Sequence, residues 1–437
     1  MNKNEILEVL EDWNFWRKDQ DTGFPRLQYL KQLQSLKDSN QIIVITGARR
    51  SGKSYLMRGF AKKLISDGTS KDNILFINFE DPRFHKLDTE LLQKIYETYL
   101  ESLNPKGSIY IFLDEIQEIP EWEKWVRTMH ELKKANLIIS GSNARLLSRE
   151  LSTLITGRHV DITVFPLSFK EFLSFNNLEV NNSLDLVNKK IDIKRLLSEY
   201  FEHGSFPEVV LAGAKKQILL AYFDDLLNKD LIRRYEIRKT GKIKELAIYY
   251  LSNISTPSTY NSLKKQLLLT TDTIEKFSGY IESIYLIFFV KRFSFKLKVQ
   301  EKSPRKTYAI DVGLSNQVGF RFSLNTGRMA ENLVFLELLR KKSLDPKMEL
   351  FYFKNERHRE VDFVIKESLK VKSAVQVCWN IEDLKTKKRE INSLIVGLED
   401  LKLKEGLVIT EDYENVEYYK EFEIKFIPLY KWLLNQA

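Results

Sequence analysis

The 437-residue sequence contains a single cysteine, Cys378, so no disulfide framework can form within the chain. This scarcity fits a reducing compartment. The sequence also lacks any apolar run near the roughly 18 residues that a membrane-spanning helix needs. Its densest apolar run, Tyr285 to Val290, is far shorter, and the first residues, Met1 to Glu5, show no apolar signal core. We therefore expect a cytoplasmic protein without a membrane segment.

The balance of apolar and charged residues is that of a globular protein. Hydrophobic residues make up 43% and charged residues 30%, which argues against a disordered chain. The length favours two or three domains over one. Lysine and arginine number 69 against 60 acidic residues, for a formal net charge of +9. This excess permits contact with a polyanion without establishing it, because a modest positive balance also serves solubility.

Short apolar runs separated by helical stretches begin after residue 40. This alternation predicts an α/β fold with a parallel sheet that is covered by helices on both faces. Residues 1–40 are expected to form a helical preamble to this domain, because apolar residues recur there at helical spacing. The predicted strands are Ile42–Ile45, Ile74–Asn78, Ile109–Leu113, Leu137–Ile139 and Val160–Val164.

The predicted secondary structure changes twice in the remainder of the chain. A mainly helical stretch extends to about residue 300, and strands alternate with helices again from about residue 306. The predicted strands of this last part are Leu350–Phe353, Val361–Ile365, Ala374–Val377 and Leu407–Ile409. We therefore predict a preamble (1–40), a P-loop domain (41–205), a helical linker with a second module (206–305) and a second α/β domain (306–437).

The stretch from Gly47 to Ser54 reads GARRSGKS and matches the pattern G-x-x-x-x-G-K-[ST] between a predicted strand and a predicted helix. In such a P-loop, backbone N–H groups and the helix N-terminus surround phosphate groups. Lys53 is expected to contact the β- and γ-phosphates, and the Ser54 hydroxyl to bind Mg²⁺. The sequence therefore predicts ATP and Mg²⁺ as cofactors. The predicted nucleotide-binding residues are Gly47, Ala48, Arg49, Arg50, Ser51, Gly52, Lys53, Ser54 and Tyr55.

Two carboxylates, Asp114 and Glu115, follow the third predicted strand. Asp114 is expected beside the Mg²⁺ ion, as in a Walker B motif. Glu115 is expected to polarise the attacking water, which favours hydrolysis over nucleotide storage. The alternative is a strand that ends in a solvated acidic turn.

Polar residues also follow the fourth predicted strand, in the order Ser140-Gly141-Ser142-Asn143. A polar side chain at this edge of the sheet would sense the γ-phosphate. Asn143 or Ser142 is the candidate. The alternative is a cap for a helix over residues 144–150.

These motifs resemble one AAA+ ATPase family of bacteria and archaea when they are taken together with Thr156-Gly157-Arg158 and the stretch Phe165–Phe172. The resemblance extends from about Trp13 to Leu434. It implies a P-loop ATPase domain, a winged helix and a C-terminal domain of uncharacterised function that is similar to restriction endonucleases.

The resemblance also implies that Arg158 acts as a charge sensor or arginine finger, which adds it to Lys53, Glu115 and Asn143 as a catalytic candidate. A surface arginine is the alternative. AAA+ resemblance implies rings, but an arginine that acts within its own subunit needs no neighbour. The oligomeric state therefore stays open.

Between Tyr235 and Lys298, three helix-like pieces followed by an apolar hairpin predict a winged helix-turn-helix. The predicted helices are Ile243–Ser252, Tyr260–Leu268 and Thr273–Ile284, the last capped by Thr271 or Asp272, and the strands lie within Tyr285–Lys298. The third helix carries more acidic than basic residues, so it is a poor reader of a phosphate-lined groove.

The segment from Lys291 to Lys306 is rich in lysine and arginine and carries one acidic residue, Glu301. This basic strip is the candidate DNA contact, through phosphates and not bases. The alternative is a solvated hairpin that packs domains together.

In the last domain, Asp362 and the strand containing Gln376 and Cys378 have the spacing of the restriction-endonuclease-like superfamily, and Glu331 matches an upstream helix acid. That superfamily has an acid-x-Lys motif where this chain has Gln376 and Cys378. An amide brings no charge to a Mg²⁺ site, and a thiol is a poor ligand for a hard cation. We therefore expect a degenerate nuclease site without cleavage activity, and a buried Cys378 that acts as a small hydrophobe. Lysines of the next helix, Lys385, Lys387 or Lys388, are candidates to replace the missing lysine.

The leading hypothesis is an ATPase whose nucleotide state moves the winged helix and the nuclease-like domain. One alternative is a metal-dependent nuclease controlled by ATP. Another is a signalling or protein-interaction switch with an unknown protein partner and no role for nucleic acid. The sequence identifies neither the partner nor the pathway.

Overall fold

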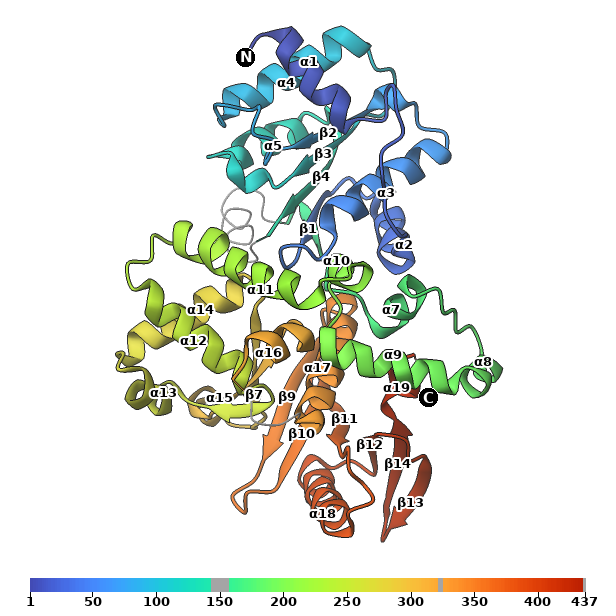
Figure 1. Cartoon of the computed structure of the whole chain (residues 1–437), viewed down its shortest axis with the longest axis vertical. Coiled ribbons are helices and arrows are strands. Elements are labelled where there is room, and N and C mark those ends of the chain that lie inside the picture. Colours follow the sequence, from blue (N-terminus) through green and yellow to red (C-terminus); the bar gives the residue numbers. More distant parts are fainter. Residues whose placement is uncertain (143–156, 321–324, 435–437) are drawn as a thin grey trace. The chain divides into compact units, whose positions relative to one another are not determined.

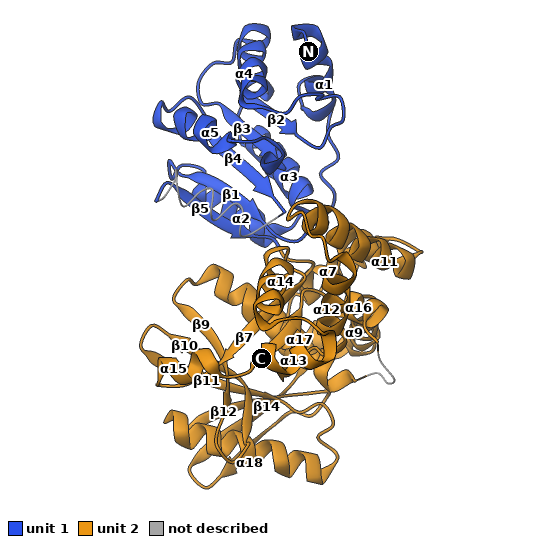
Figure 2. Cartoon of the chain, turned by 90° about the vertical axis from the view of Figure 1, so that its left-hand side faces the viewer, with its two compact units in different colours: residues 1–164 blue, residues 165–437 orange. Residues whose placement is uncertain are grey.

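The computed structural model describes residues 1–142, 157–320 and 325–434 (Figure 1). The chain forms two compact units, residues 1–164 (unit 1) and 165–437 (unit 2), coloured separately in Figure 2. Every helix within the described ranges is too short or too polar to cross a membrane.

Unit 1 is built on a parallel sheet with the strand order β2-β3-β4-β1-β5. Its strands are β1 Ile42–Thr46, β2 Ile74–Asn78, β3 Tyr110–Asp114, β4 Asn136–Gly141 and β5 His159–Thr163. All five predicted strands are confirmed, with ends that differ by two residues or fewer. Because β4 lies between β1 and β3, the carboxyl ends of these three strands meet at one edge of the sheet.

Helices cover both faces of this sheet (Figure 1). Residues of α1 (Lys3–Trp13), α4 (Thr89–Leu103) and α5 (Trp122–Glu131) share one core with Ile42 and Val44. Residues of α2 (Leu27–Leu36) and α3 (Lys53–Ser66) share the other core with Ile43 and Ile45. Successive residues of β1 are therefore all apolar, since both faces of the strand are buried. Two short 3₁₀ turns, η1 (Lys71–Asn73) and η2 (Ile116–Glu118), complete unit 1.

The predicted preamble is an integral part of unit 1. After α1, the buried Asn14 side chain accepts a hydrogen bond from the Phe76 N–H (2.7 Å) and donates one to the Phe76 carbonyl (2.9 Å). The Trp16 indole N–H donates to the carbonyl of Ile74 (2.9 Å). These side chains satisfy backbone groups at the edge of β2 that lack a neighbouring strand.

Unit 2 contains a mixed sheet with the strand order β13-β14-β12-β11-β10-β9-β7-β8-β6. Its strands are β6 Thr256–Ser258, β7 Ile287–Arg292, β8 Arg305–Ala309, β9 Met348–Lys354, β10 Glu360–Glu367, β11 Lys370–Val377, β12 Glu405–Thr410, β13 Asn415–Tyr419 and β14 Phe422–Pro428. The four strands predicted for the last domain correspond to β9 to β12.

The helices of unit 2 are short except for α17 and α18, which lie over the C-terminal part of the sheet (Figure 1). They are α7 Phe169–Phe175, α8 Ser183–Asn188, α9 Lys190–His203, α10 Pro207–Leu211, α11 Lys215–Asp225, the π-helical η3 Leu226–Arg233, α12 Thr240–Ser252, α13 Tyr260–Leu267, α14 Thr271–Ser283, α15 Leu297–Lys302, α16 Val312–Val318, α17 Thr326–Leu344, α18 Leu384–Leu401 and α19 Leu429–Leu433.

Helices α12, α13 and α14 confirm the three helices predicted for the middle of the chain, although Thr270 caps α14 in place of Thr271 or Asp272. The hairpin predicted within Tyr285–Lys298 is wrong. Strand β7 pairs in an antiparallel manner with β8, and α15 lies between them in the chain. The apolar alternation that suggested a second strand continues into Phe295 and Leu297, which are 81% and 71% exposed.

Both borders predicted beyond residue 164, at 205/206 and 305/306, fall within unit 2. Strand β7 pairs with β8 across the second of these borders, and also pairs with β9. The sheet is therefore continuous from β6 to β13. The four-part division stays a prediction about modules.

Candidate functional site

The P-loop joins β1 to α3 at the carboxyl edge of the unit 1 sheet. Gly47 has φ +141°, and a Cβ at this position would lie 2.1 Å from the carbonyl oxygen of Val164. Gly52 is the N-cap of α3 and has φ +98°. Both positions require glycine, because a side chain would clash at the first and be strained at both. The local sequence thus produces a loop whose backbone turns directly into a helix N-terminus.

Lys53 is buried, with 4% exposure. Its Nζ donates to the carbonyls of Gly47 (3.2 Å) and Ala48 (3.3 Å). The same atom lies 3.5 Å from Oε1 of Glu115. The predicted phosphate-binding lysine and the predicted base therefore lie side by side.

Asp114 ends β3 and is fully buried. Its Oδ1 accepts a hydrogen bond from the Ser140 hydroxyl on β4, while Oδ2 is buried and has no hydrogen-bond partner within the described ranges. Burial and the charge of Glu115 raise the pKa of Asp114, against hydrogen bonds from Ser140 and Ser54 and the charge of Lys53. A carboxylate oxygen near a serine hydroxyl is the kind of donor that Mg²⁺ prefers, and a bound cation would favour the ionised form. These residues fit a magnesium ion.

Glu115 is 7% exposed and has φ +54°, a conformation that turns the chain sharply after β3. Its backbone N–H donates to the Ser140 hydroxyl (3.0 Å), and the Gln117 amide donates to its Oε2 (2.5 Å). Sequence reasoning missed these roles of Ser140 and Gln117. The position of Ser140 at the end of the strand beside β3 was the available signal.

Of the two γ-phosphate sensor candidates, Ser142 is buried with 2% exposure, just beyond the end of β4. Asn143 lies outside the described residues. The sensor role of either residue stays a prediction.

Two contacts of the P-loop, one exposed ion pair and one buried hydrogen bond, were not indicated by any sequence motif. The Arg49 guanidinium donates to Oε1 of Glu80, just after β2, at 2.9 and 2.6 Å. Burial raises the pKa of Glu80, although Arg49 opposes this shift. From the segment before α2, Arg26 is 5% exposed and its Nη1 donates to the Ser51 carbonyl (3.0 Å). Arg26 thereby fixes the loop from outside the predicted domain.

Of the predicted nucleotide-binding residues, Arg50 lies within the loop and Tyr55 follows it on α3. Arg50 has φ +64°, and Tyr55, on α3, is 46% exposed. The Arg58 guanidinium lies 4.3 Å from the Tyr55 ring centroid. Nucleotide contacts of Arg50 and Tyr55 stay predictions.

Arg158 lies at the opposite edge of the sheet from the P-loop. Its carbonyl accepts a hydrogen bond from the N–H of Ile42, at the start of β1, and its guanidinium pairs with Glu131 at the end of α5. The P-loop follows the other end of β1, about 13 Å away at 3.3 Å per residue. The role of Arg158 as a charge sensor or arginine finger stays a prediction. Whether it acts within its own subunit or on a neighbouring one stays open.

The Pro-Leu-Ser-Phe stretch begins unit 2 and is anchored there. Ser168 caps α7 in a capping box with Glu171. The Arg340 guanidinium, from α17, donates to the carbonyls of Pro166 and Leu167, both at 3.1 Å. The stretch therefore fixes the chain immediately after it leaves unit 1.

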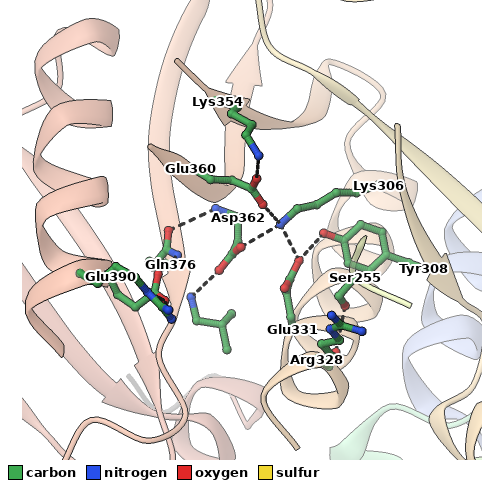
Figure 3. Close-up of polar contacts among 12 residues, drawn as sticks. Ser255, Lys306, Tyr308, Arg328, Glu331, Lys354, Glu360, Asp362, Gln376 and Glu390 are labelled. Carbon is green, nitrogen blue, oxygen red and sulfur yellow. Dashed lines mark hydrogen bonds and ion pairs between the residues drawn. The ribbon is translucent and has the colours of Figure 1, made fainter. Parts of the chain in front are cut away.

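In unit 2, Glu331, Asp362 and Gln376 lie close together (Figure 3). The Lys306 ammonium contacts Glu331 at 2.9 Å and Asp362 at 2.8 Å, and the backbone N–H of Asp362 donates to the Gln376 amide oxygen (3.3 Å). Sequence reasoning placed Lys306 in an exposed strip, but its side chain is 1% exposed. That assignment is wrong, because β8 pairs inside the sheet and carries Lys306 into the interior.

The fourth residue of the predicted nuclease-like site, Cys378, belongs to a hydrophobic core cluster instead. It is 2% exposed, and burial raises the pKa of its thiol to about 12. Lys387, a candidate for the missing lysine, pairs with Glu417 at 2.6 Å. Within the described ranges, no group of three or more histidine, cysteine and acidic side chains has an arrangement that would hold a metal ion.

The exposed part of the basic strip is smaller than predicted. Lys291 pairs with Glu301 (2.6 Å), and Arg305 donates to the Tyr260 hydroxyl (3.2 Å). The exposed lysines on and beside α15 are Lys296, Lys298 and Lys302.

Comparison with known proteins agrees with the fold of unit 1. The family described as an AAA domain matches residues 39–173, and two families described as domains of unknown function, DUF8612 and DUF4143, match residues 194–326 and 326–432. Together with the parallel sheet and its P-loop, the first match defines an AAA-type P-loop ATPase domain, a class that binds and hydrolyses nucleotides.

Two uncharacterised proteins match almost the whole chain. One, from Methanocaldococcus jannaschii, is 35% identical over 410 residues, which is 91% of this chain and 89% of that protein. Another, from Haemophilus influenzae, is 32% identical over 427 residues, which is 94% of this chain and 98% of that protein. The chain belongs to the family of these proteins.

Likenesses to solved structures are more distant. A Walker-type ATPase of Pyrococcus abyssi has a TM-score of 0.43 at 13% identity and covers 70% of this chain and 99% of its own. DnaA from Aquifex aeolicus, bound to AMPPCP, has a TM-score of 0.25 at 14% identity and covers 59% of this chain and 65% of its own. The assignment of unit 1 therefore rests on its topology and the family match.

Proposed function

We propose that this protein binds ATP with Mg²⁺ at the P-loop, hydrolyses it, and uses the change of nucleotide state to alter the conformation of unit 2. The observation that carries this proposal is the convergence of Lys53, Asp114 and Glu115 beside the glycine loop. Lys53 lies 3.5 Å from Glu115, and the two acids are adjacent in the chain at the end of β3.

Each of these residues has a defined chemical task. Lys53 and the loop N–H groups would bind the phosphates, and Ser54 and Asp114 would hold Mg²⁺, which would supply positive charge to the phosphoryl oxygens. Phosphate oxygens are stronger acceptors for Lys53 than the two carbonyls it now contacts. Lys53 then turns from Glu115 toward the nucleotide, and the freed carboxylate accepts a proton from the attacking water.

The connection between the units offers a covalent route for coupling. Val164, the last residue of unit 1, donates its N–H to the Thr46 carbonyl (2.7 Å), and its own carbonyl lies against Gly47. Two residues later, Arg340 holds the carbonyls of Pro166 and Leu167. A backbone shift at Gly47 therefore displaces Val164, and the short segment after Val164 connects this shift to the residues that Arg340 holds in unit 2.

For unit 2 we propose a winged helix followed by a degenerate restriction-endonuclease-like domain. The element order α12, β6, α13, α14, β7, α15, β8 supports the first assignment, and the grouping of Glu331, Asp362 and Gln376 supports the second. We propose DNA as a ligand of the exposed lysines of α15. A switch that acts on a protein partner is the rival, and binding of mixed-sequence DNA across a salt series separates the two.

Phosphate release by purified protein tests the ATPase proposal directly. Lys53→Ala should lower the rate by about a hundredfold or more, because it removes the charge that stabilises the transferred phosphoryl group. Lys63→Ala, on the same helix but paired with Asp67 at the surface, is the matched control and should keep the wild-type rate. Equal rates for wild type and Lys53→Ala would refute hydrolysis at this site.

A further inference from the structure

The centre of unit 2 contains a buried ammonium surrounded by carboxylates (Figure 3). Lys306 Nζ lies 2.9 Å from Oε1 of Glu331, 2.8 Å from Oε1 of Glu360 and 2.8 Å from Oδ1 of Asp362. These partners come from α17 and β10, whereas Lys306 belongs to β8. An ammonium has three N–H donors, so three carboxylate oxygens saturate it.

Each carboxylate is also held by a second donor, which fixes where its oxygens point. The Tyr308 hydroxyl donates to Glu331 (2.7 Å), Lys354 to Glu360 (3.0 Å) and the backbone N–H of Val377 to Asp362 (2.9 Å). The oxygens are therefore held in place around the Lys306 ammonium, which occupies the point at which they meet.

The protonation of these groups matches a single positive charge at that point. Burial and the charge of Asp362 raise the pKa of Glu331 to about 8, so this side chain is largely protonated at neutral pH. Burial raises the pKa of Glu360, but Lys306 and Lys354 outweigh it and leave the pKa lowered. The lowered pKa of Glu360 favours its ionised form opposite Lys306 and Lys354.

We propose that Lys306 occupies the cation position of a carboxylate site, so that an ammonium of the chain itself replaces a divalent metal. In this arrangement Lys306 links β8 to α17 and β10, and the cluster of Lys306 and its three carboxylates stabilises the fold of unit 2. Removal of the ammonium should convert the same oxygens into a binding site for a hard divalent cation, which takes oxygen ligands at about 2.0–2.6 Å. This inference is independent of ATP hydrolysis, because it concerns unit 2 without nucleotide.

The test measures Mn²⁺ binding by the disappearance of free-ion electron paramagnetic resonance in nucleotide-free protein. Wild type should show no Mn²⁺ binding that depends on Asp362. Lys306→Ala should bind one Mn²⁺ per chain about tenfold more tightly or better, and Mn²⁺ should raise its thermal midpoint. Lys366→Ala, which removes a lysine of β10 from its pair with Glu349 (2.9 Å), should behave as wild type.

The double variant Lys306→Ala/Asp362→Asn should lose the Mn²⁺ binding gained by the single variant. Circular dichroism verifies folding, and Lys306→Gln, which keeps hydrogen-bonding capacity, replaces the alanine variant if that one is unfolded with and without Mn²⁺. A folded Lys306 variant without the gain would overturn the proposal. So would Mn²⁺ binding, or metal-dependent cleavage of DNA or RNA, that wild type shows and Asp362→Ala abolishes.

Discussion

Two buried lysines, Lys53 and Lys306, differ in the partners that hold them. Lys53 has two carbonyls and one carboxylate at 3.2–3.5 Å, whereas Lys306 has three carboxylates at 2.8–2.9 Å. Charge-assisted hydrogen bonds at the shorter distance are the stronger kind. The looser partners of Lys53 suit exchange for incoming phosphate, and the tight partners of Lys306 suit a permanent contact.

Glu331 provides a test of the Lys306 centre through pH. Burial raises the pKa of Glu331 from 4.5 to about 8, so the folded chain retains a proton that the unfolded chain releases. Stability from this group is present at low pH and is lost as pH rises toward 8. Glu331→Gln keeps an oxygen acceptor for Tyr308 and Lys306 but cannot titrate.

Urea unfolding of wild type and Glu331→Gln at several pH values therefore gives a difference in unfolding free energy that depends on pH. The advantage of wild type over the variant should shrink steadily between about pH 5 and pH 8.5. A difference that stays constant over this range would contradict a proton held by Glu331.

At the scale of elements, the sequence was sufficient where the signal is local. Strands β1 to β4 of unit 1 are largely buried on both faces and contain continuous apolar runs, whereas β5 at the edge of the sheet is only partly buried. The sequence signal of the P-loop is equally local, because the backbone conformation of the loop itself requires its glycines. By contrast, β13 is largely exposed and offers no such run, so it was not predicted.

What the sequence could not provide are contacts between distant segments. Lys306 and its partner Asp362 are brought together only by the pairing of β7 with β8 and with β9. Arg158 could be assigned to an edge of the sheet only once β5 was known to run parallel to β1. Residue type and spacing do not encode either relation.

The exposed lysines of α15 give the element-scale prediction for nucleic acid. Reversal of Lys296, Lys298 and Lys302 to glutamate should weaken binding of mixed-sequence DNA. It should also lower the salt slope by about one for each phosphate that the protein no longer neutralises. The measurement is fluorescence anisotropy of labelled duplex across a salt series.

Reversal of three exposed lysines of unit 1, Lys124, Lys133 and Lys134, is the matched control for net charge and should have the smaller effect. Equal reductions in affinity for the two sets would show that binding follows total charge and not α15. Absence of binding by wild type at low salt would favour the protein-interaction switch.

At the scale of the whole molecule, the chain passes from unit 1 to unit 2 between Val164 and Phe165. The N–H of Val164 donates to the carbonyl of Thr46, the residue before the P-loop. We expect the distribution of distances between the units to differ between nucleotide-free protein and protein held with ATP. The expectation follows because Gly47 contacts the backbone of Val164 directly.

Spin labels at exposed positions Lys62 and Lys216, after replacement of each by cysteine, measure this distribution. The native Cys378 should not react, since it is buried and its thiol pKa is raised to about 12. Superimposable distributions with and without Mg²⁺ and ATP would remove the conformational part of the proposed function.

The most direct test of the account is equilibrium binding of ATP in the presence of Mg²⁺, measured by titration calorimetry on wild type, Glu115→Gln and Lys53→Ala. Glu115→Gln should bind ATP as wild type does while releasing phosphate at least about a hundredfold more slowly, because it keeps the loop and loses the base. Lys53→Ala should bind about tenfold more weakly or worse. If wild type shows no affinity for ATP with Mg²⁺, the P-loop has no nucleotide-binding function and the account is wrong.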